Sequence, residues 1–301
     1  MRSKNVLGSR LTNDLLLEIK FQLKSRWTIA LFVACTVIAI GNALLSYSFI
    51  TTMAPILEVH QANQGPEFGT WLVNSGEAEN FRNEIYAANP ANAVNSILMI
   101  FASIGPLIFI IWGASVIGNE FARRTARNKA AHMGWLRTVV IKLITVILMT
   151  FFSVGMTVLL GLLSGKAGWE ILKSKYAWID VPYGGETIHI SVAFLTVVLG
   201  VAFYGILAFF VALLFKNFPI GIIVGFAIPY VEAAVQKWWL PQTAFGHLLN
   251  EILHYDEASI IGAPQITSIP PFLWISPLII LAWMMLLLIL CNVIPRNQEI
   301  A

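Results

Sequence analysis

The stretch GNEFARRTARNKAAHMGWLRTVVIK, residues 118–142, is strongly charged and lies between two long apolar runs in the middle of the chain. Its residues favour a helix, on which Thr125 and Lys129 fall along one ridge while Arg123 and Arg127 fall along the next. A helix with charges spread around it is expected on the membrane surface and not across the bilayer. Charge alone assigns no function, because cytoplasmic loops of membrane proteins generally collect Lys and Arg.

Composition places the chain in a membrane. Of its 301 residues, 57% are hydrophobic and 12% are charged, and the mean hydropathy is +0.75, whereas a soluble domain has about 25% charged residues. Stretches long enough to cross about 30 Å of hydrocarbon predict an all-α integral membrane protein, a single transmembrane domain of residues 1–301. Its six predicted transmembrane helices are residues 27–50, 93–117, 139–163, 190–215, 218–234 and 272–293. The fifth contains Pro219 and Pro229 and is expected to be kinked or broken.

The distribution of charge predicts the orientation of these helices. With a cytoplasmic N-terminus, 14 of the 19 Lys and Arg residues lie inside and 12 of the 16 Asp and Glu residues lie outside. We therefore expect a multi-pass protein of the cell membrane with both termini in the cytoplasm. The basic inner side indicates contact with membrane lipid and gives no case for nucleic-acid binding.

Three segments outside the spans have recognisable patterns. Residues 11–26 repeat Leu or Ile every fourth position with charged residues between, which predicts an amphipathic interfacial helix that is retained in the mature protein. Residues 51–92 form a long external loop, in which 77–88 have helix-forming character; a disordered or partner-binding loop is the alternative. Residues 237–271 form a second external loop, with a short amphipathic helix predicted on the outer surface.

Residues that carry out chemistry are few. The chain has no phosphate-binding G-x-x-x-x-G-K-[ST] motif, so it is not expected to bind ATP by itself. His247, Glu251 and His254 have the spacing to share a helix face as metal ligands, but a solvated helix is the stronger interpretation, and no metal site is predicted. Cys35 and Cys291 are expected to be small buried residues of the spans. The sequence therefore predicts no enzyme.

Charged residues inside a span would indicate a transport pathway, because each is costly in hydrocarbon. The apolar cores are expected to contain none. Glu232, three residues after Pro229, is the nearest candidate for a translocation path; its alternative is an interfacial carboxylate at a helix end. An ion-coupled carrier is therefore not favoured.

The order of residues in the opening stretch resembles a segment that follows the second membrane helix of ABC-2-type transporter permeases. The matching residues are Glu120, Thr125-Ala126-Arg127-Asn128-Lys129, Gly134, Arg137 and Lys142. The family usually has Gly immediately before the Thr, where this chain has Arg124, and the spacing from Thr125 to Arg137 is about one residue longer.

The resemblance implies a function. In the family, this segment is a cytoplasmic coupling helix, here 119–135, that docks on a separate ATPase subunit, and the 11–26 helix corresponds to the family's elbow helix. The implied ATPase-coupling residues are Glu120, Arg123, Arg124, Thr125, Arg127 and Lys129. The resemblance also implies a second permease chain in a homodimer or heterodimer, with ATP and Mg²⁺ bound by the ATPase partners. Export of a hydrophobic peptide, an antibiotic or a lipid-like substrate is the usual activity.

A second hypothesis belongs to another class. The chain would then be a non-transporting immunity or sensory subunit that binds a peptide through the external loop 51–92. Co-purification separates the two hypotheses, because only the transporter requires a bound ATPase.

Overall fold

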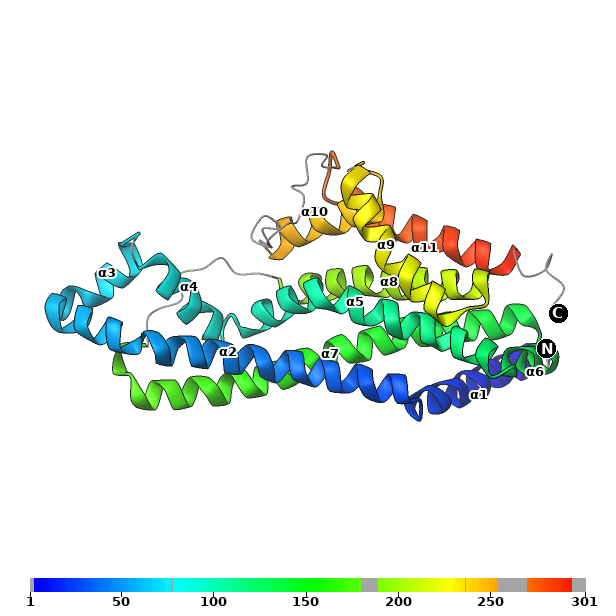
Figure 1. Cartoon of the computed structure of the whole chain (residues 1–301), viewed down its shortest axis with the longest axis horizontal. Helices are drawn as coiled ribbons and strands as arrows, with labels where there is room; N and C mark the ends of the chain where they lie inside the picture. Colours follow the sequence, from blue (N-terminus) through cyan, green and yellow to red (C-terminus); the bar gives the residue numbers. More distant parts are fainter. Residues whose placement is uncertain (1–2, 77, 180–188, 236, 254–269, 294–301) are drawn as a thin grey trace.

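The computed structural model describes residues 3–76, 78–179, 189–235, 237–253 and 270–293, and all regular elements in these ranges are helices. Five helices are long and apolar enough to cross a membrane: α2 (Arg26–Gln64), α5 (Ala93–Ala122), α7 (Trp135–Lys175), α8 (Ile190–Phe215) and α9 (Phe218–Val235). The sixth predicted span corresponds to α11 (Ile275–Val293), whose apolar part is shorter. The chain is thus an all-helical protein compatible with a membrane (Figure 1).

Helix α8 forms the centre of the bundle, where it lies beside α5 (Figure 1). It carries no charged residue and is buried on nearly all sides, as expected for a helix that is apolar all round. The two helices approach most closely at Gly113 and Gly205, where a Cβ added to Gly113 would lie 2.2 Å from the carbonyl oxygen of Gly205. Glycine is needed here because the two backbones are in contact.

We expect G113A to destabilise the protein. The added methyl group meets backbone atoms that cannot rotate away, and such overpacking typically costs about 1–3 kcal/mol. Thermal unfolding of the purified protein and its abundance in the membrane measure the effect. G41A is the matched control, because a Cβ at Gly41 of α2 has no neighbour within 4 Å. Equal stability of the two variants would contradict the close α5–α8 contact.

Helices α2 and α7 extend far beyond a membrane span. They have 39 and 41 residues, which corresponds to about 60 Å each and twice the hydrocarbon thickness. Their far ends pack with η1 (Gly65–Glu67), α3 (Phe68–Asn74), α4 (Glu79–Ala88) and η2 (Ala177–Ile179). We call this part the headpiece; it lies on the left of Figure 1.

The headpiece has its own hydrophobic core. Its buried members are Ile50, Leu57, Phe68, Leu72, Ala78, Ile85, Ala88, Trp169, Leu172 and Ile179. The segment predicted as the external loop 51–92 is therefore largely helical: α2 continues past residue 50 to Gln64, and α4 falls within the stretch 77–88 that was predicted to favour a helix. The segment 51–92 is ordered by packing against the end of α7, which is far away in sequence.

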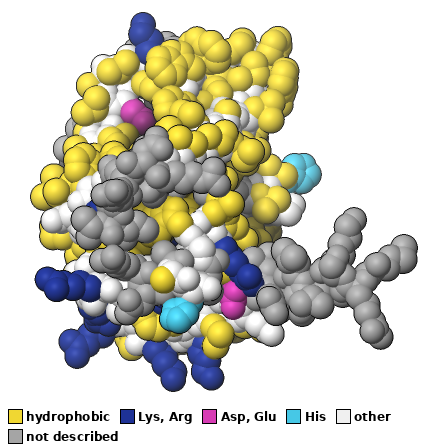
Figure 2. Space-filling model, turned by 90° about the vertical axis from the view of Figure 1, so that its right-hand side faces the viewer, with side chains coloured by type: hydrophobic (Ala, Val, Ile, Leu, Met, Phe, Trp, Pro, Cys, Tyr) yellow, Lys and Arg dark blue, Asp and Glu magenta, His cyan; other side chains and the backbone are white. Residues whose placement is uncertain are grey.

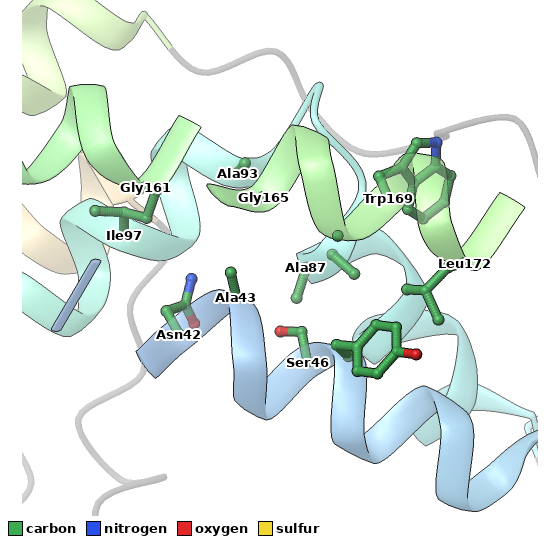
Figure 3. A pocket seen from close by; sticks show the side chains of 13 residues that line it. Asn42, Ala43, Ser46, Ala87, Ala93, Ile97, Gly161, Gly165, Trp169 and Leu172 are labelled. Carbon is green, nitrogen blue, oxygen red and sulfur yellow. The ribbon is translucent and has the colours of Figure 1, made fainter. Parts of the chain in front are cut away.

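A small pocket lies where the headpiece joins the bundle, between α2, α4, α5 and α7 (Figure 3). Most of its lining side chains are small, among them Ala43, Ala93 and Gly165, with the hydroxyl of Ser46 beside them. At its edge, a Cβ added to Gly161 would lie 2.1 Å from the Cδ1 atom of Ile97. Small residues thus allow α5 and α7 to pack closely below the headpiece.

Candidate functional site

The charged stretch of the sequence forms a short helix between two sharp turns. Helix α5 ends at Ala122, α6 spans Thr125–Met133, and α7 begins at Trp135. Arg124 and Gly134, which flank α6, have φ angles of 58° and 80°. These are left-handed conformations, which Gly adopts readily and Arg rarely. The backbone at Arg124 is therefore in a conformation that favours Gly.

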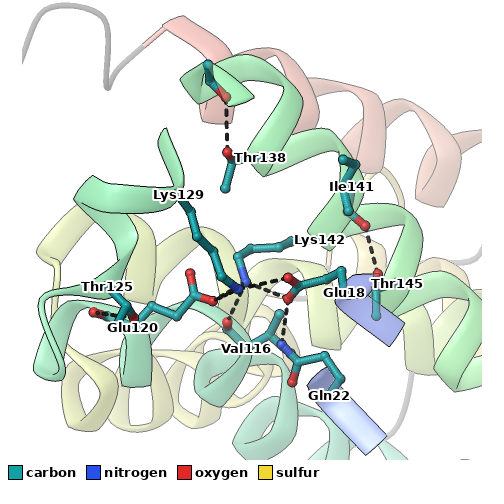
Figure 4. A network of polar contacts seen from close by, with 11 residues as sticks. Glu18, Gln22, Val116, Glu120, Thr125, Lys129, Thr138, Ile141, Lys142 and Thr145 are labelled. Carbon is teal, nitrogen blue, oxygen red and sulfur yellow. Dashed lines mark hydrogen bonds and ion pairs between the residues drawn. The ribbon is translucent and has the colours of Figure 1, made fainter. Parts of the chain in front are cut away.

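Four charged side chains, three of them buried, meet beside α6, and we call Glu18, Glu120, Lys129 and Lys142 the inner ion cluster (Figure 4). They come from four helices: α1 (Ser3–Leu23), α5, α6 and α7. Lys142 is the centre, with its Nζ atom 2.7 Å from Glu18 Oε1 and 2.8 Å from Glu120 Oε1. Lys129 Nζ lies 2.9 Å from Glu18 Oε2 and also pairs with Glu120 Oε1.

Three members of the cluster are shielded from solvent, while the Lys129 side chain is 26% exposed. The exposed fraction is 0% for Lys142, 3% for Glu120 and 6% for Glu18. Neighbouring groups complete the shell: Lys142 also donates to the carbonyl of Val116 at 3.2 Å, and Gln22 Nε2 donates to Glu18 Oε1 at 2.8 Å. Two carboxylates face two ammonium groups, so the cluster carries no net charge. One oxygen, Glu120 Oε2, is buried without a hydrogen-bond partner among the described residues.

The neighbouring charges favour the charged forms of Glu18 and Lys129. Burial by itself raises the pKa of Glu18, but the ammonium groups of Lys142 and Lys129 and the hydrogen bond from Gln22 lower that pKa from 4.5 to about 2. Burial lowers the pKa of Lys129, and its contacts with Glu120 and Glu18 outweigh this and raise the pKa. The contribution of Glu18 to stability is therefore present above pH 4.5 and is lost as the pH falls towards 2.

Helix α1 packs on α7 through polar groups. Glu18 and Gln22 are buried against α7, and Asp14 forms an ion pair with Arg137. The large apolar side chains Leu16, Leu17, Phe21 and Leu23 are exposed instead. The predicted amphipathic pattern is thus present, but a polar contact faces the protein and leucines face outward, which suits a helix lying in a lipid interface.

The predicted coupling residues divide into two groups. Glu120 and Lys129 point into the inner ion cluster, and their partners belong to this chain. Arg123, Arg124 and Thr125 are exposed, and Thr125 Oγ1 donates to the carbonyl of Glu120 at 3.4 Å. Arg127 belongs to α6, and its side chain lies outside the described part. Figure 2 shows Lys and Arg gathered on the end of the molecule near α1 and α6.

The pairing of these charges is not evident from the sequence. The apolar cores were expected to contain no ionisable residue, but Lys142 lies inside the predicted span 139–163 and is fully buried. A Lys among Val139, Val140 and Ile141 is itself evidence for a buried carboxylate partner. Glu18 could not be recognised as that partner, because its helical pattern places it on a polar face like any solvated residue.

The candidate for a translocation path, Glu232, lies on α9 and is half-buried. Its Oε2 atom accepts a hydrogen bond of 2.9 Å from the backbone N–H of Gln242, near the start of α10 (Pro241–Leu253). The side-chain oxygen of Gln242 accepts a hydrogen bond from the hydroxyl of Tyr204 on α8. Glu232 is thus fixed against the bundle on one side.

Helix α10 is the short helix predicted in 237–271, but it is packed against α8 and α11 and mostly buried. The expectation of a solvated His247 is wrong, because only 6% of this residue is exposed and its Nδ1 atom lies 2.9 Å from Ser276 Oγ of α11. Burial lowers the pKa of His247. His254, the other candidate in its set, lies outside the described residues.

Searches of family models, curated proteins and solved structures found no match to this chain.

Proposed function

We propose that this chain is the membrane-spanning permease subunit of an ABC transporter that exports a hydrophobic peptide, an antibiotic or a lipid-like molecule. In this proposal α6 is the coupling helix, α1 is the elbow helix, and a separate ATPase binds ATP and Mg²⁺. The observation that supports it best is the inner ion cluster, which ties α6 to α1, α5 and α7. A surface loop that served only as a topology determinant would not need such buried connections.

The cluster suits force transmission. Lys129 of α6 holds carboxylates of α1 and α5 at once, and Lys142 of α7 holds the same two carboxylates. A displacement of α6 by a closing ATPase dimer would therefore pull on three helices together. Separating buried charges is costly, so the four helices are expected to move as one unit. Arg123 and Arg124, which are exposed, would meet the ATPase.

The proposal includes six membrane spans with α11 as the sixth, both termini in the cytoplasm, and a pairing with a second permease chain. The headpiece then lies outside the cell. We expect a Cys at Asn63, exposed at the headpiece end of α2, to react with an impermeant thiol reagent in intact cells. A Cys at Ala131, exposed on α6, should react only after the membrane is permeabilised. Labelling of the Ala131 position in intact cells would contradict this topology.

The test of the proposed function is isolation of the chain from its own cells in mild detergent. We expect a P-loop ATPase to co-purify and the complex to hydrolyse ATP. The chain purified alone should show no hydrolysis above background, since it has no phosphate-binding motif. Absence of an ATPase from a gently solubilised, folded sample would reject the transporter.

The headpiece favours a second candidate function, a non-transporting immunity or sensory subunit that binds a peptide outside the membrane. This candidate is supported by the separate hydrophobic core of the headpiece, which is more structure than a connecting loop requires. A folded chain without an ATPase partner would favour it.

A further inference from the structure

Glu232 lies deep along the bundle. Helices α8 and α9 are joined by a turn at Lys216 and Asn217, and the ring of Phe218 lies 5.0 Å from that of Trp27 at the start of α2. This contact places the turn level with the end of the bundle nearest α1. At 1.5 Å per residue, Tyr204 lies about 18 Å and Glu232 about 21 Å from the turn, which is within the roughly 30 Å of hydrocarbon.

The carboxylate of Glu232 has unusual surroundings. It is the sole charged side chain of α8, α9 and α11. Among the described residues, no Lys, Arg or His forms an ion pair with it. On the same helix, Ile223, Val231 and Val235 are exposed. A carboxylate on such an apolar face is costly against lipid and calls for a partner.

Helix capping explains only part of this position. Leu240, which precedes α10, has no polar side chain, and Glu232 Oε2 accepts the N–H of Gln242 in its place. A neutral Gln side chain could also accept that bond, although a carboxylate accepts it more strongly and is favoured at a helix N-terminus. That preference is smaller than the cost of an unpaired charge in hydrocarbon, so capping alone does not account for the negative charge at this position.

Two aromatic residues stand in the turn that leads to Gln242, the residue whose N–H bonds Glu232. Trp238 and Trp239 are exposed in the turn before α10, and Trp239 is three residues from Gln242. The ring of Trp239 stacks on Trp283 of α11 with centroids 6.2 Å apart, and Trp283 Nε1 donates to the carbonyl of Trp239 at 3.0 Å. The ring is thus held in place while one face of it remains available. Aromatic faces attract organic cations, and a carboxylate in the same part of the chain adds a negative charge to that attraction.

We infer that Glu232 is the recognition point for a lipophilic cation, with the ammonium-type charge at the carboxylate and the apolar body along α9 and the Trp238–Trp239 turn. This inference rests on the proposed function and specifies its substrate class as cationic amphiphiles. A neutral lipid-like substrate would find an unpaired charge in its path and would be disfavoured.

Binding of radiolabelled tetraphenylphosphonium to the full chain in lipid nanodiscs tests the inference. We expect saturable binding that E232Q weakens at least tenfold, that E232D weakens no more than threefold, and that uncharged triphenylphosphine oxide does not displace. E251Q is the matched control, because Glu251 is an exposed carboxylate at the other end of α10; its affinity should stay within twofold of the wild type.

Unchanged affinity in E232Q, or no saturable binding to the wild type, would overturn the inference and leave Glu232 as a helix cap. If E232Q fails to accumulate, W239A decides: a loss of at least threefold supports the site, and unchanged affinity rejects it. The assay needs neither ATP nor an ATPase. Cation binding without an ATPase partner would therefore reject the transporter while sustaining this site. An ATPase partner without cation binding would support the transporter and reject this site.

Discussion

Replacing Lys142 by Met is expected to destabilise the protein by about 3–5 kcal/mol, since removal of one partner from a buried ion pair leaves an uncompensated charge. In the inner ion cluster, Lys142 contacts both Glu18 and Glu120, and Lys129 alone cannot balance two buried carboxylates. The variant should accumulate poorly in the membrane and unfold at a lower temperature. Quantitative immunoblotting and thermal unfolding in detergent measure both effects.

Two further variants isolate the charge effect. K166M removes an exposed Lys from the same helix, and its stability should stay within about 0.5 kcal/mol of the wild type. Adding E120Q to K142M removes the unpaired charge and should restore at least half of the lost stability. If K142M were as stable as K166M, the inner ion cluster would not hold these helices together.

In the transporter proposed above, reversing the charge of Arg123 and Arg124 is expected to weaken ATPase binding strongly without affecting folding. Both side chains are exposed beside α6 and outside the inner ion cluster. Lost charge pairs and new like-charge contacts at an interface cost about 2–5 kcal/mol, which corresponds to a loss of affinity of at least thirtyfold. R123E/R124E should therefore reach normal abundance, lose the co-purifying ATPase and lose export.

K24E/K216E is the control for this variant. It reverses two exposed basic residues at other turns on the side proposed to be cytoplasmic, so the change in charge on that side is the same. Lys216 also has a left-handed φ of 51°, which matches Arg124 in backbone conformation. If the charges act only as topology determinants, both double variants should insert poorly to a similar degree. That outcome would reject the coupling role of α6.

Several helices could be predicted because their information is local. Length and apolar composition placed predicted spans within α2, α5, α7, α8 and α9, and the cost of leaving backbone polar groups unpaired in lipid makes a helix the natural structure for such stretches. The left-handed turn at Arg124 was not predicted. Arg itself gives no indication of that conformation.

The helical structure of the headpiece could not be predicted from the local sequence. Residues 51–92 were predicted to be a loop because they are polar on average. Their apolar members Leu57, Leu72 and Ile85 become buried only when they meet Trp169 and Leu172 at the far end of α7. Neither residues 51–92 nor the end of α7 can bury these side chains alone. The helical structure of residues 51–92 therefore depends on a contact between distant parts of the chain.

The sequence by itself determined that this is an all-helical protein suited to a membrane, with a charged helix between two apolar ones, because transfer from water to lipid depends on each segment's own residues. Only the tertiary structure decided that Glu120 and Lys129 point inward to Glu18 and Lys142, and that Glu232 remains half-buried against α10. The pairing of charges joins residues 124 positions apart. It depends on which helix faces pack together, a choice made by the free energy of the whole bundle and not by any one stretch.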